Sequence, residues 1–155
     1  MTGVQTCALP ISTIETTYLG GLRTEATHLQ SGTKIITDAP TDNQGKGERF
    51  SPTDLVATAL GSCMLTIMGQ KARDHKIDLK GTRIEIQKIM KSEPRKMSGI
   101  TLTFHLPDHL RLSEKQIIIL QRAAETCPVR LSIHPEIEVE INFNWPTAAE
   151  EFSSY

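Results

Sequence analysis

The chain has 155 residues, with 17 lysines and arginines against 18 aspartates and glutamates, and three cysteines. This is the length of one domain, which buries its core without disulfides or a structural metal. The near-neutral charge excludes a protein that binds nucleic acid by neutralising phosphates, and no run of 18 apolar residues would span a membrane. Three cysteines without CxxC or zinc-ligand spacing fit a reducing, cytoplasmic location better than a secreted disulfide framework.

The first twelve residues have neither the segments of a signal peptide nor a strand or helix period. They resemble a translated sequencing adapter, so we interpret 1–12 as a non-native leader, with a disordered N-terminus as the alternative. Under both interpretations Cys7 lies on a tail and takes no part in the mechanism. One domain is then expected over 13–145, followed by a frayed tail over 146–155.

Three strands and a loop are expected before the first helix. Apolar and β-branched residues over 14–29 predict two strands around Gly20-Gly21, and a third strand is expected over 33–37. Residues 38–50 are rich in turn-forming residues and almost devoid of apolar ones, which predicts a long loop. A loop of this length in a small domain is often functional.

A long helix is expected to begin at Ser51-Pro52-Thr53-Asp54 and to run to about Asp74. Serine suits the N-cap, proline the first helical position and an acid the third. Steps of three and four residues define a buried stripe that includes Cys63; it comprises Leu55, Val56, Ala59, Leu60, Cys63, Met64, Ile67 and Met68. The other side of this helix carries small residues and no charged ones, which indicates that a second helix or subunit lies close by. These residues are Ala57, Thr58, Gly61 and Ser62.

Two further strands are expected over 83–90 and 100–106, where apolar and polar residues alternate. They are expected to form a hairpin whose solvated tip spans 91–96.

A second helix is expected from the capping box Ser113 to Gln116, and four successive apolar residues follow. Such a helix is expected to be buried nearly all round, inside the fold or across a dimer interface. Pro128 ends it after Cys127, and a last strand is expected over 137–144. This order of elements predicts an α+β protein with an antiparallel sheet on two apolar helices.

Several familiar sites are disfavoured. Gly45-Lys46-Gly47 is more often a flexible loop than a phosphate cradle, and no GxSxG motif marks a serine hydrolase. The five histidines lack metal-ligand spacing. We therefore expect neither a metal nor a cofactor.

The two remaining cysteines are candidates for chemistry. Each taken alone is more often a small hydrophobic residue than a nucleophile. However, one lies on each apolar helix, and the break at Pro128 gives Cys127 freedom to swing toward Cys63.

A reactive Cys63 needs a cation nearby, because burial alone raises a thiol's pKa. Arg23 and Arg49 are both candidates, and the sequence does not decide between them. An acid would orient the arginine; the local candidates are Glu48, Asp54 and Glu25.

Two segments carry a resemblance to a known family. They are Ser51-Pro-Thr-Asp-Leu-Val-Ala-Thr-Ala-Leu-Gly-Ser-Cys63 and Glu125-Thr-Cys-Pro-Val129. Together they resemble the OsmC/Ohr family of osmotically inducible and organic hydroperoxide resistance proteins, over about 13–145. The resemblance implies an intertwined homodimer, in which antiparallel sheets wrap around two central apolar helices and the active sites lie at the subunit interface.

By this resemblance, Cys63 would attack a small organic hydroperoxide and become a sulfenic acid, in defence against oxidative stress. Cys127 would resolve it to a disulfide, and an external dithiol would reduce that disulfide. An apolar pocket around Cys63 would favour organic peroxides over hydrogen peroxide.

One residue departs from the family pattern. The peroxidase branches have a glutamate directly after the helix-starting proline, where this chain has Thr53. The alternative function is an OsmC-like binding or redox-sensing module that holds a small hydrophobic ligand at the dimer interface without turnover. A cysteine hydrolase ranks third, because no histidine is predicted near Cys63.

Overall fold

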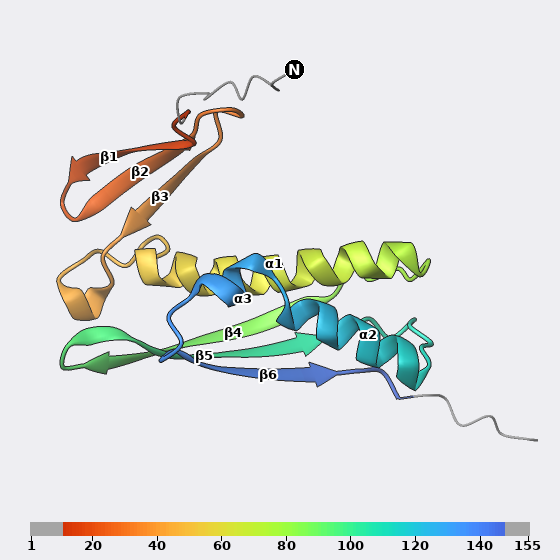
Figure 1. The fold of residues 1–155 in the computed structure, drawn as a ribbon. Helices are drawn as coiled ribbons and strands as arrows, with labels where there is room; N and C mark the ends of the chain where they lie inside the picture. The colour runs from red at the N-terminus through yellow and green to blue at the C-terminus, as the bar shows by residue number, and fades with distance from the viewer. Residues whose placement is uncertain (1–10, 148–155) are drawn as a thin grey trace, which may run out of the picture. The chain divides into compact units, whose positions relative to one another are not determined.

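The computed structural model describes residues 11–147 (Figure 1). The chain divides into two compact units, Met1–Pro52 and Thr53–Tyr155, and each is described by itself. Most of the expected leader over 1–12 and of the expected tail over 146–155 lies outside the described residues.

The N-terminal unit is a three-stranded antiparallel sheet in the order β1-β2-β3. Its strands are β1 (Ile14–Gly20), β2 (Arg23–His28) and β3 (Lys34–Asp38), close to the ranges that the apolar and β-branched residues predict. The register of β2 against β3 places Arg23 opposite Asp38. A loop residue of the sequence-based prediction, Asp38, is thus the last residue of a strand.

The loop after β3 is ordered by its own backbone. It contains a 3-10 turn, Thr41–Asn43, and the amides of Gly45 and Gly47 donate to the carbonyls of Pro40 and Ala39 at 3.0 and 3.2 Å. A Cβ on Gly45 would overlap the carbonyl of Ala39. The glycines therefore allow close backbone packing, where the sequence suggested flexibility.

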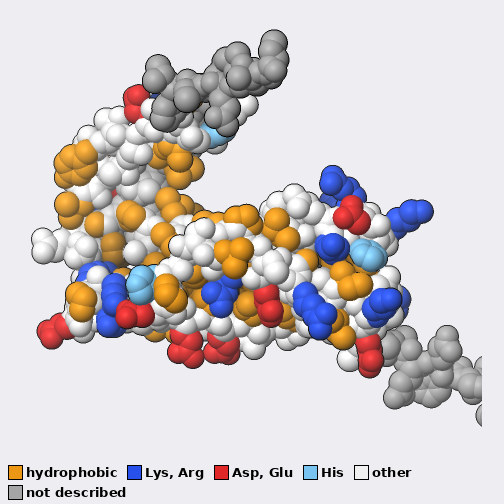
Figure 2. Space-filling model, in the orientation of Figure 1, with side chains coloured by type: hydrophobic (Ala, Val, Ile, Leu, Met, Phe, Trp, Pro, Cys, Tyr) orange, Lys and Arg blue, Asp and Glu red, His pale blue; other side chains and the backbone are white. Residues whose placement is uncertain are grey.

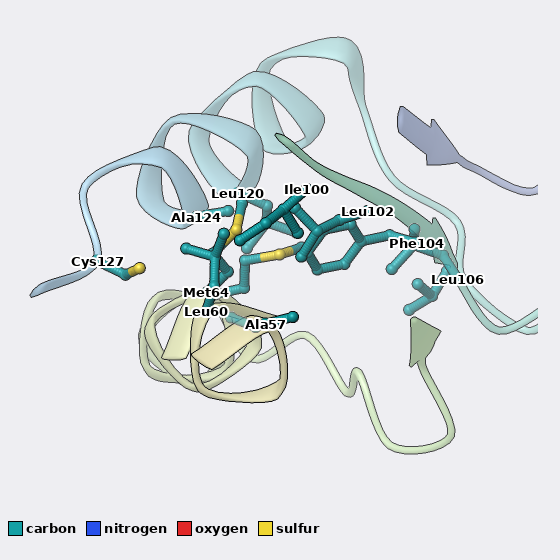
Figure 3. Close-up of a cluster of buried hydrophobic side chains, with 13 residues drawn as sticks. Ala57, Leu60, Met64, Ile100, Leu102, Phe104, Leu106, Leu120, Ala124 and Cys127 are labelled. Carbon is teal, nitrogen blue, oxygen red and sulfur yellow. The ribbon is translucent and has the colours of Figure 1, made fainter. Parts of the chain in front are cut away.

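The C-terminal unit packs three helices and a three-stranded sheet. Its elements are α1 (Pro52–Asp74), β4 (Arg83–Ser92), β5 (Arg95–His105), α2 (Glu114–Glu125), α3 (Pro128–Ser132) and β6 (Glu138–Asn144). The core lies between α1, α2 and the sheet (Figure 3). Its fully buried side chains include Leu60, Met64, Met68, Ile100, Leu102, Phe104 and Leu120.

The sheet β4-β5-β6 is mixed. β4 and β5 form the expected antiparallel hairpin, but β6 runs parallel to β5, as the arrows in Figure 1 show. The connection through α2 and α3 returns the chain to the end of the sheet where β5 begins, and such a crossover joins parallel strands. The α+β class is confirmed, while the expectation of purely antiparallel strands is wrong for β6.

The hairpin tip is shorter than the expected 91–96. β4 runs to Ser92 and β5 begins at Arg95, so only Glu93-Pro94 joins them. The charged residues at the ends of the strands continue the backbone ladder while their side chains are solvated, and polarity alone therefore suggested a longer loop.

The buried face of α1 differs from the expected stripe. It comprises Ala57, Leu60, Gly61, Met64, Met68 and Ala72, whereas Val56 is 38% exposed. A Cβ on Gly61 would lie 2.6 Å from Cδ1 of Ile86. Gly61 thus lets α1 approach the branched side chain of Ile86 on the sheet, and the close approach of a second helix or subunit stays a prediction.

The second helix has its predicted start. Ser113 accepts from the amide of Gln116 at 3.2 Å, and the side chain of Gln116 accepts from the amide of Ser113 at 2.9 Å. Within the single chain α2 is not buried all round, because Ile118 is 46% exposed, and burial across a dimer interface stays a prediction. Only the face of α2 toward the core is covered, by packing of Leu120 and Ala124.

Candidate active site

Cys127 occupies the junction between α2 and α3. α2 ends at Glu125, and Pro128 begins α3, where its missing N–H costs no helical hydrogen bond. Cys127 is therefore the N-cap of α3, with an extended backbone at φ −68° and ψ 147°. Its sulfur accepts from the amide of Arg130, with 3.3 Å between nitrogen and sulfur.

The side chain of Cys63 is a close neighbour of Cys127, near enough to raise the pKa of the Cys127 thiol. Both thiols are free in this structure. Cys127 is fully buried and its sulfur points toward the core side chains in Figure 3, whereas Cys63, on the middle of α1, is half-buried. The fold thus brings together two thiols that the sequence could place only on separate helices.

Burial raises the pKa of the Cys127 thiol above its ordinary value of 9.0. The amide of Arg130 acts in the opposite direction, and the neighbouring Cys63 raises the pKa of Cys127 further. At neutral pH Cys127 is therefore a protonated thiol.

Arg23 is held by two carboxylates in the N-terminal unit. Its Nε and Nη2 donate to the two oxygens of Asp38 at 2.7 and 2.8 Å, and Nη2 donates to Glu48 at 2.9 Å. Asp38 is only 1% exposed and also accepts from the amide of Glu48 at 3.2 Å. The Arg23 guanidinium holds the pKa of Asp38 below its ordinary value, and the two carboxylates raise the pKa of Arg23.

The other candidates from the N-terminal unit have different partners. Glu25 accepts from Lys34 at 2.8 Å and makes no bond to Arg23. Arg49 is exposed and donates to the backbone carbonyl of Glu48 at 3.1 Å. Of the acids considered from the sequence, Glu48 is therefore the one that contacts an arginine of the set.

Asp54 and Thr53, at the start of α1, both accept from Lys88 of β4. The Nζ atom of Lys88 lies 2.9 Å from Oγ1 of Thr53 and 2.8 Å from Oδ1 of Asp54. Lys88 is 18% exposed. At the position where the sequence departs from the family's glutamate, the C-terminal unit thus has a bond from a lysine to a threonine.

Two residues of these networks were missed from the sequence, and each had a signal. The position of Asp38 opposite Arg23 could be inferred from strand register, because a hairpin turn near Gly32 pairs the two residues. Lys88 is two residues beyond Ile86 on β4, so strand alternation gives it the same face as the apolar residues. A charged residue on such a face requires a partner.

Within residues 11–147, no group of three or more histidine, cysteine, aspartate or glutamate side chains could hold a metal ion. Over the same range, no helix is both long enough and apolar enough to cross a membrane.

A hollow of about 530 Å³ lies in the C-terminal unit beside α3. It is lined by Glu125, Arg130, Leu131, Val139 and Ile141. These residues come from the α2–α3 region and from β6, and the side chain of Cys127 is not among them.

The fold and the pair of contacting thiols define an α+β protein with two cysteines brought together from separate helices. A family model described as OsmC-like protein matches residues 45–142. The chain belongs to the OsmC-like family.

Solved structures agree with this assignment. A protein from Psychrobacter arcticus, whose name refers to osmotic stress induction and a detoxification response, is 51% identical, with a TM-score of 0.82 over 86% of this chain and 96% of that one. An organic hydroperoxide resistance protein OsmC from Legionella pneumophila is 19% identical, with a TM-score of 0.68 over 87% and 98%. An OsmC-like protein from Mycoplasma pneumoniae is 16% identical, with a TM-score of 0.71 over 86% and 96%. No curated protein matches the chain.

Proposed function

We propose that this protein reduces small organic hydroperoxides through Cys63 and Cys127, at the expense of an external dithiol, and so contributes to defence against oxidative stress. The observation that carries the proposal is that the two free thiols, from separate helices, are neighbours in the folded chain. Membership of the OsmC-like family supports it, since relatives of the same fold are named for organic hydroperoxide resistance.

The cycle has three steps. The Cys63 thiolate attacks the hydroperoxide, the O–O bond breaks, the alcohol leaves after taking up a proton, and Cys63 becomes a sulfenic acid. The Cys127 sulfur then attacks the Cys63 sulfur, and water leaves as the disulfide forms. Two thiol exchanges with a dithiol return both cysteines to thiols and leave the reductant as a disulfide.

The first step needs a cation that keeps Cys63 ionised, and we favour Arg23 over Arg49. Arg23 is fixed by Asp38 and Glu48, whereas Arg49 is exposed. A fixed guanidinium loses less conformational entropy on binding a thiolate. Among the described residues nothing bonds to Nη1 of Arg23, so its two N–H groups remain available as donors.

The direct test is turnover with cumene hydroperoxide and dihydrolipoamide, in a Cys7→Ser background that removes the third thiol. We expect catalytic production of cumyl alcohol by the parent and none by Cys63→Ser. Without the dithiol, Cys127→Ser should consume about one equivalent of hydroperoxide and stop at the Cys63 sulfenic acid, because no second thiol is present to resolve it. Equal turnover by parent and Cys63→Ser would refute the proposal.

The same variants distinguish the proposed peroxidase from the alternative function. A binding or sensing module would show no turnover in the parent, and Cys63→Ser would still bind the hydrophobic ligand with unchanged affinity.

A further inference from the structure

We propose that the external thiol attacks the sulfur of Cys63, and that Cys127 is the leaving group, whenever the Cys63–Cys127 disulfide is reduced. The inference rests on the proposed function only for the disulfide itself, which a chemical oxidant can also form. It assigns separate tasks to the two sulfurs of one bond.

Access to the two sulfurs carries the first part of the argument. Thiol exchange depends on which sulfur the incoming thiolate can reach, and the attack must come from the side opposite the leaving sulfur. Cys127 is fully buried and belongs to the same core cluster as Leu120 and Ala124. Cys63 is half-buried and is therefore the more accessible of the two cysteines.

The hollow beside α3 does not open a second route. Glu125 and Arg130 flank Cys127 in sequence and both line this hollow, but the side chain of Cys127 does not. A thiol that enters the hollow therefore meets α3 and β6 before the sulfur of Cys127.

Two backbone amides oppose the effect of burial on a Cys127 thiolate. The amide of Arg130 already donates to its sulfur at 3.3 Å, and the amide of Val129 acts on it in the same direction. Hydrogen bonds from backbone amides to a charged sulfur offset part of the cost of its burial. Cys127 therefore departs faster than it would without these amides.

The step balances. The reductant thiolate forms a bond to the Cys63 sulfur, the bond between Cys63 and Cys127 breaks, and its electron pair leaves on Cys127, which then takes up a proton. The second thiolate of the reductant attacks the first reductant sulfur and releases Cys63 as a thiolate. Because burial raises the pKa of Cys127, protonation slows its attack back on the mixed disulfide.

Trapping the mixed disulfide tests the inference. The Cys7→Ser protein is oxidised with diamide, exposed briefly to excess 2-mercaptoethanol, quenched with acid, and alkylated with N-ethylmaleimide in denaturant. Peptide mapping should find mercaptoethanol on Cys63 in at least about tenfold excess over Cys127, with maleimide on Cys127. Mercaptoethanol on Cys127, an equal distribution, or no Cys63–Cys127 disulfide after diamide would each overturn the inference.

A second measurement tests the leaving group. Arg130→Pro removes the amide that donates to Cys127 but is tolerated in the first turn of a helix, and Arg130→Ala keeps the amide and is the matched control. Arg130→Pro should slow reduction of the diamide-formed disulfide by dithiothreitol about tenfold relative to Arg130→Ala. Equal rates in the two variants would contradict a role for the amide.

Failure of the proposed function gives a different result. A disulfide that diamide forms but cumene hydroperoxide does not would refute the peroxidase while the mercaptoethanol still marked Cys63.

Discussion

At the scale of single residues, Asp38 governs the orientation of Arg23. Its carboxylate is buried, accepts two hydrogen bonds from the guanidinium and receives the amide of Glu48. Loss of one carboxylate charge would leave a buried amide facing a guanidinium. If Arg23 activates Cys63, this residue controls the reactivity of a thiol without touching it.

Under the proposed role of Arg23, the variant Asp38→Asn should make Cys63 about tenfold less reactive toward iodoacetamide near pH 7, because Arg23 loses the carboxylate that orients it. The measurement is the pH profile of the alkylation rate in the Cys7→Ser background. Glu25→Gln, which breaks only the ion pair with Lys34, is the control and should leave the profile unchanged. A profile for Asp38→Asn identical to the parent's would contradict the role given to Arg23.

The lowered pKa of Asp38 also predicts a change in the free energy of unfolding with pH. Arg23 lowers its pKa in the folded state from the ordinary 3.8, so the stabilising effect is present above that value and is lost as pH falls through the lower folded-state pKa. Acid unfolding followed by circular dichroism should therefore show a shallower pH dependence for Asp38→Asn than for the parent. An equally steep loss of stability with falling pH in both proteins would contradict a stabilising ion pair between Arg23 and Asp38.

The protonation of Cys127 predicts the pH dependence of resolution. Its pKa lies above 9.0, so the thiolate fraction rises about tenfold per pH unit across the neutral range. Formation of the disulfide from the Cys63 sulfenic acid should accelerate accordingly between about pH 6 and pH 9, as measured by quenched alkylation. A rate that levels off below about pH 8 would show that Cys127 ionises more readily than its burial implies.

At the scale of elements, Gly61 sets the approach of α1 to the sheet. A side chain there meets Ile86, whereas a Cβ on Gly69 of the same helix meets nothing within 4 Å. Gly69→Ala should raise the free energy of unfolding by about 0.5–1 kcal/mol through helix propensity. Gly61→Ala should be at least about 1 kcal/mol less stable than Gly69→Ala, since overpacking offsets the same gain.

Urea unfolding of both glycine variants provides the measurement. Replacement of Ile86 by Val in the Gly61→Ala protein removes the contacting Cδ1 and should recover part of the loss. Equal stabilisation by the two alanines would contradict the packing.

Local patterns predict the elements themselves well. The capping box at Ser113 and the proline at position 128 locate α2 and α3, and strand alternation locates β4 and β5. The direction of β6 could not be predicted, because it depends on how α2 and α3 cross the sheet and not on any residue within the strand.

The candidate site is predicted only in part for the same reason. Cys63 and Cys127 stand out by sequence position and family resemblance, but their contact depends on tertiary packing. Polarity alone could not rank the acids near Arg23, and the strand register selects Asp38. Lys88 does not stand out in the sequence, because the alternation of β4 is recognised from its apolar residues. A charged side chain on the same face as those residues is easily overlooked.

At the scale of the whole molecule, the N-terminal sheet exposes one apolar face. Strand alternation places Ile14, Tyr18 and Ile35 on the same face, and they are 58%, 63% and 47% exposed. Figure 2 shows hydrophobic side chains in orange on the visible part of this unit. An apolar face of this kind is typical of an association surface, and the homodimer expected from the family resemblance would cover it with a second copy of the chain.

Sedimentation should therefore give about twice the mass of one chain at micromolar concentration. Ile35→Lys should weaken the dimer at least about tenfold, because it places a charge on the face to be buried. Glu15→Gln, on the opposite face of the same sheet, should leave the dimer intact. A monomeric parent protein would contradict the homodimer.

The proposed redox centre is the pair of neighbouring thiols, Cys63 and Cys127. Its most direct measurement is peptide mapping by mass spectrometry of the Cys7→Ser protein after one equivalent of cumene hydroperoxide without reductant. The account predicts loss of two hydrogen atoms and a single linked pair of peptides containing Cys63 and Cys127. Two unmodified thiols after complete mixing would contradict it.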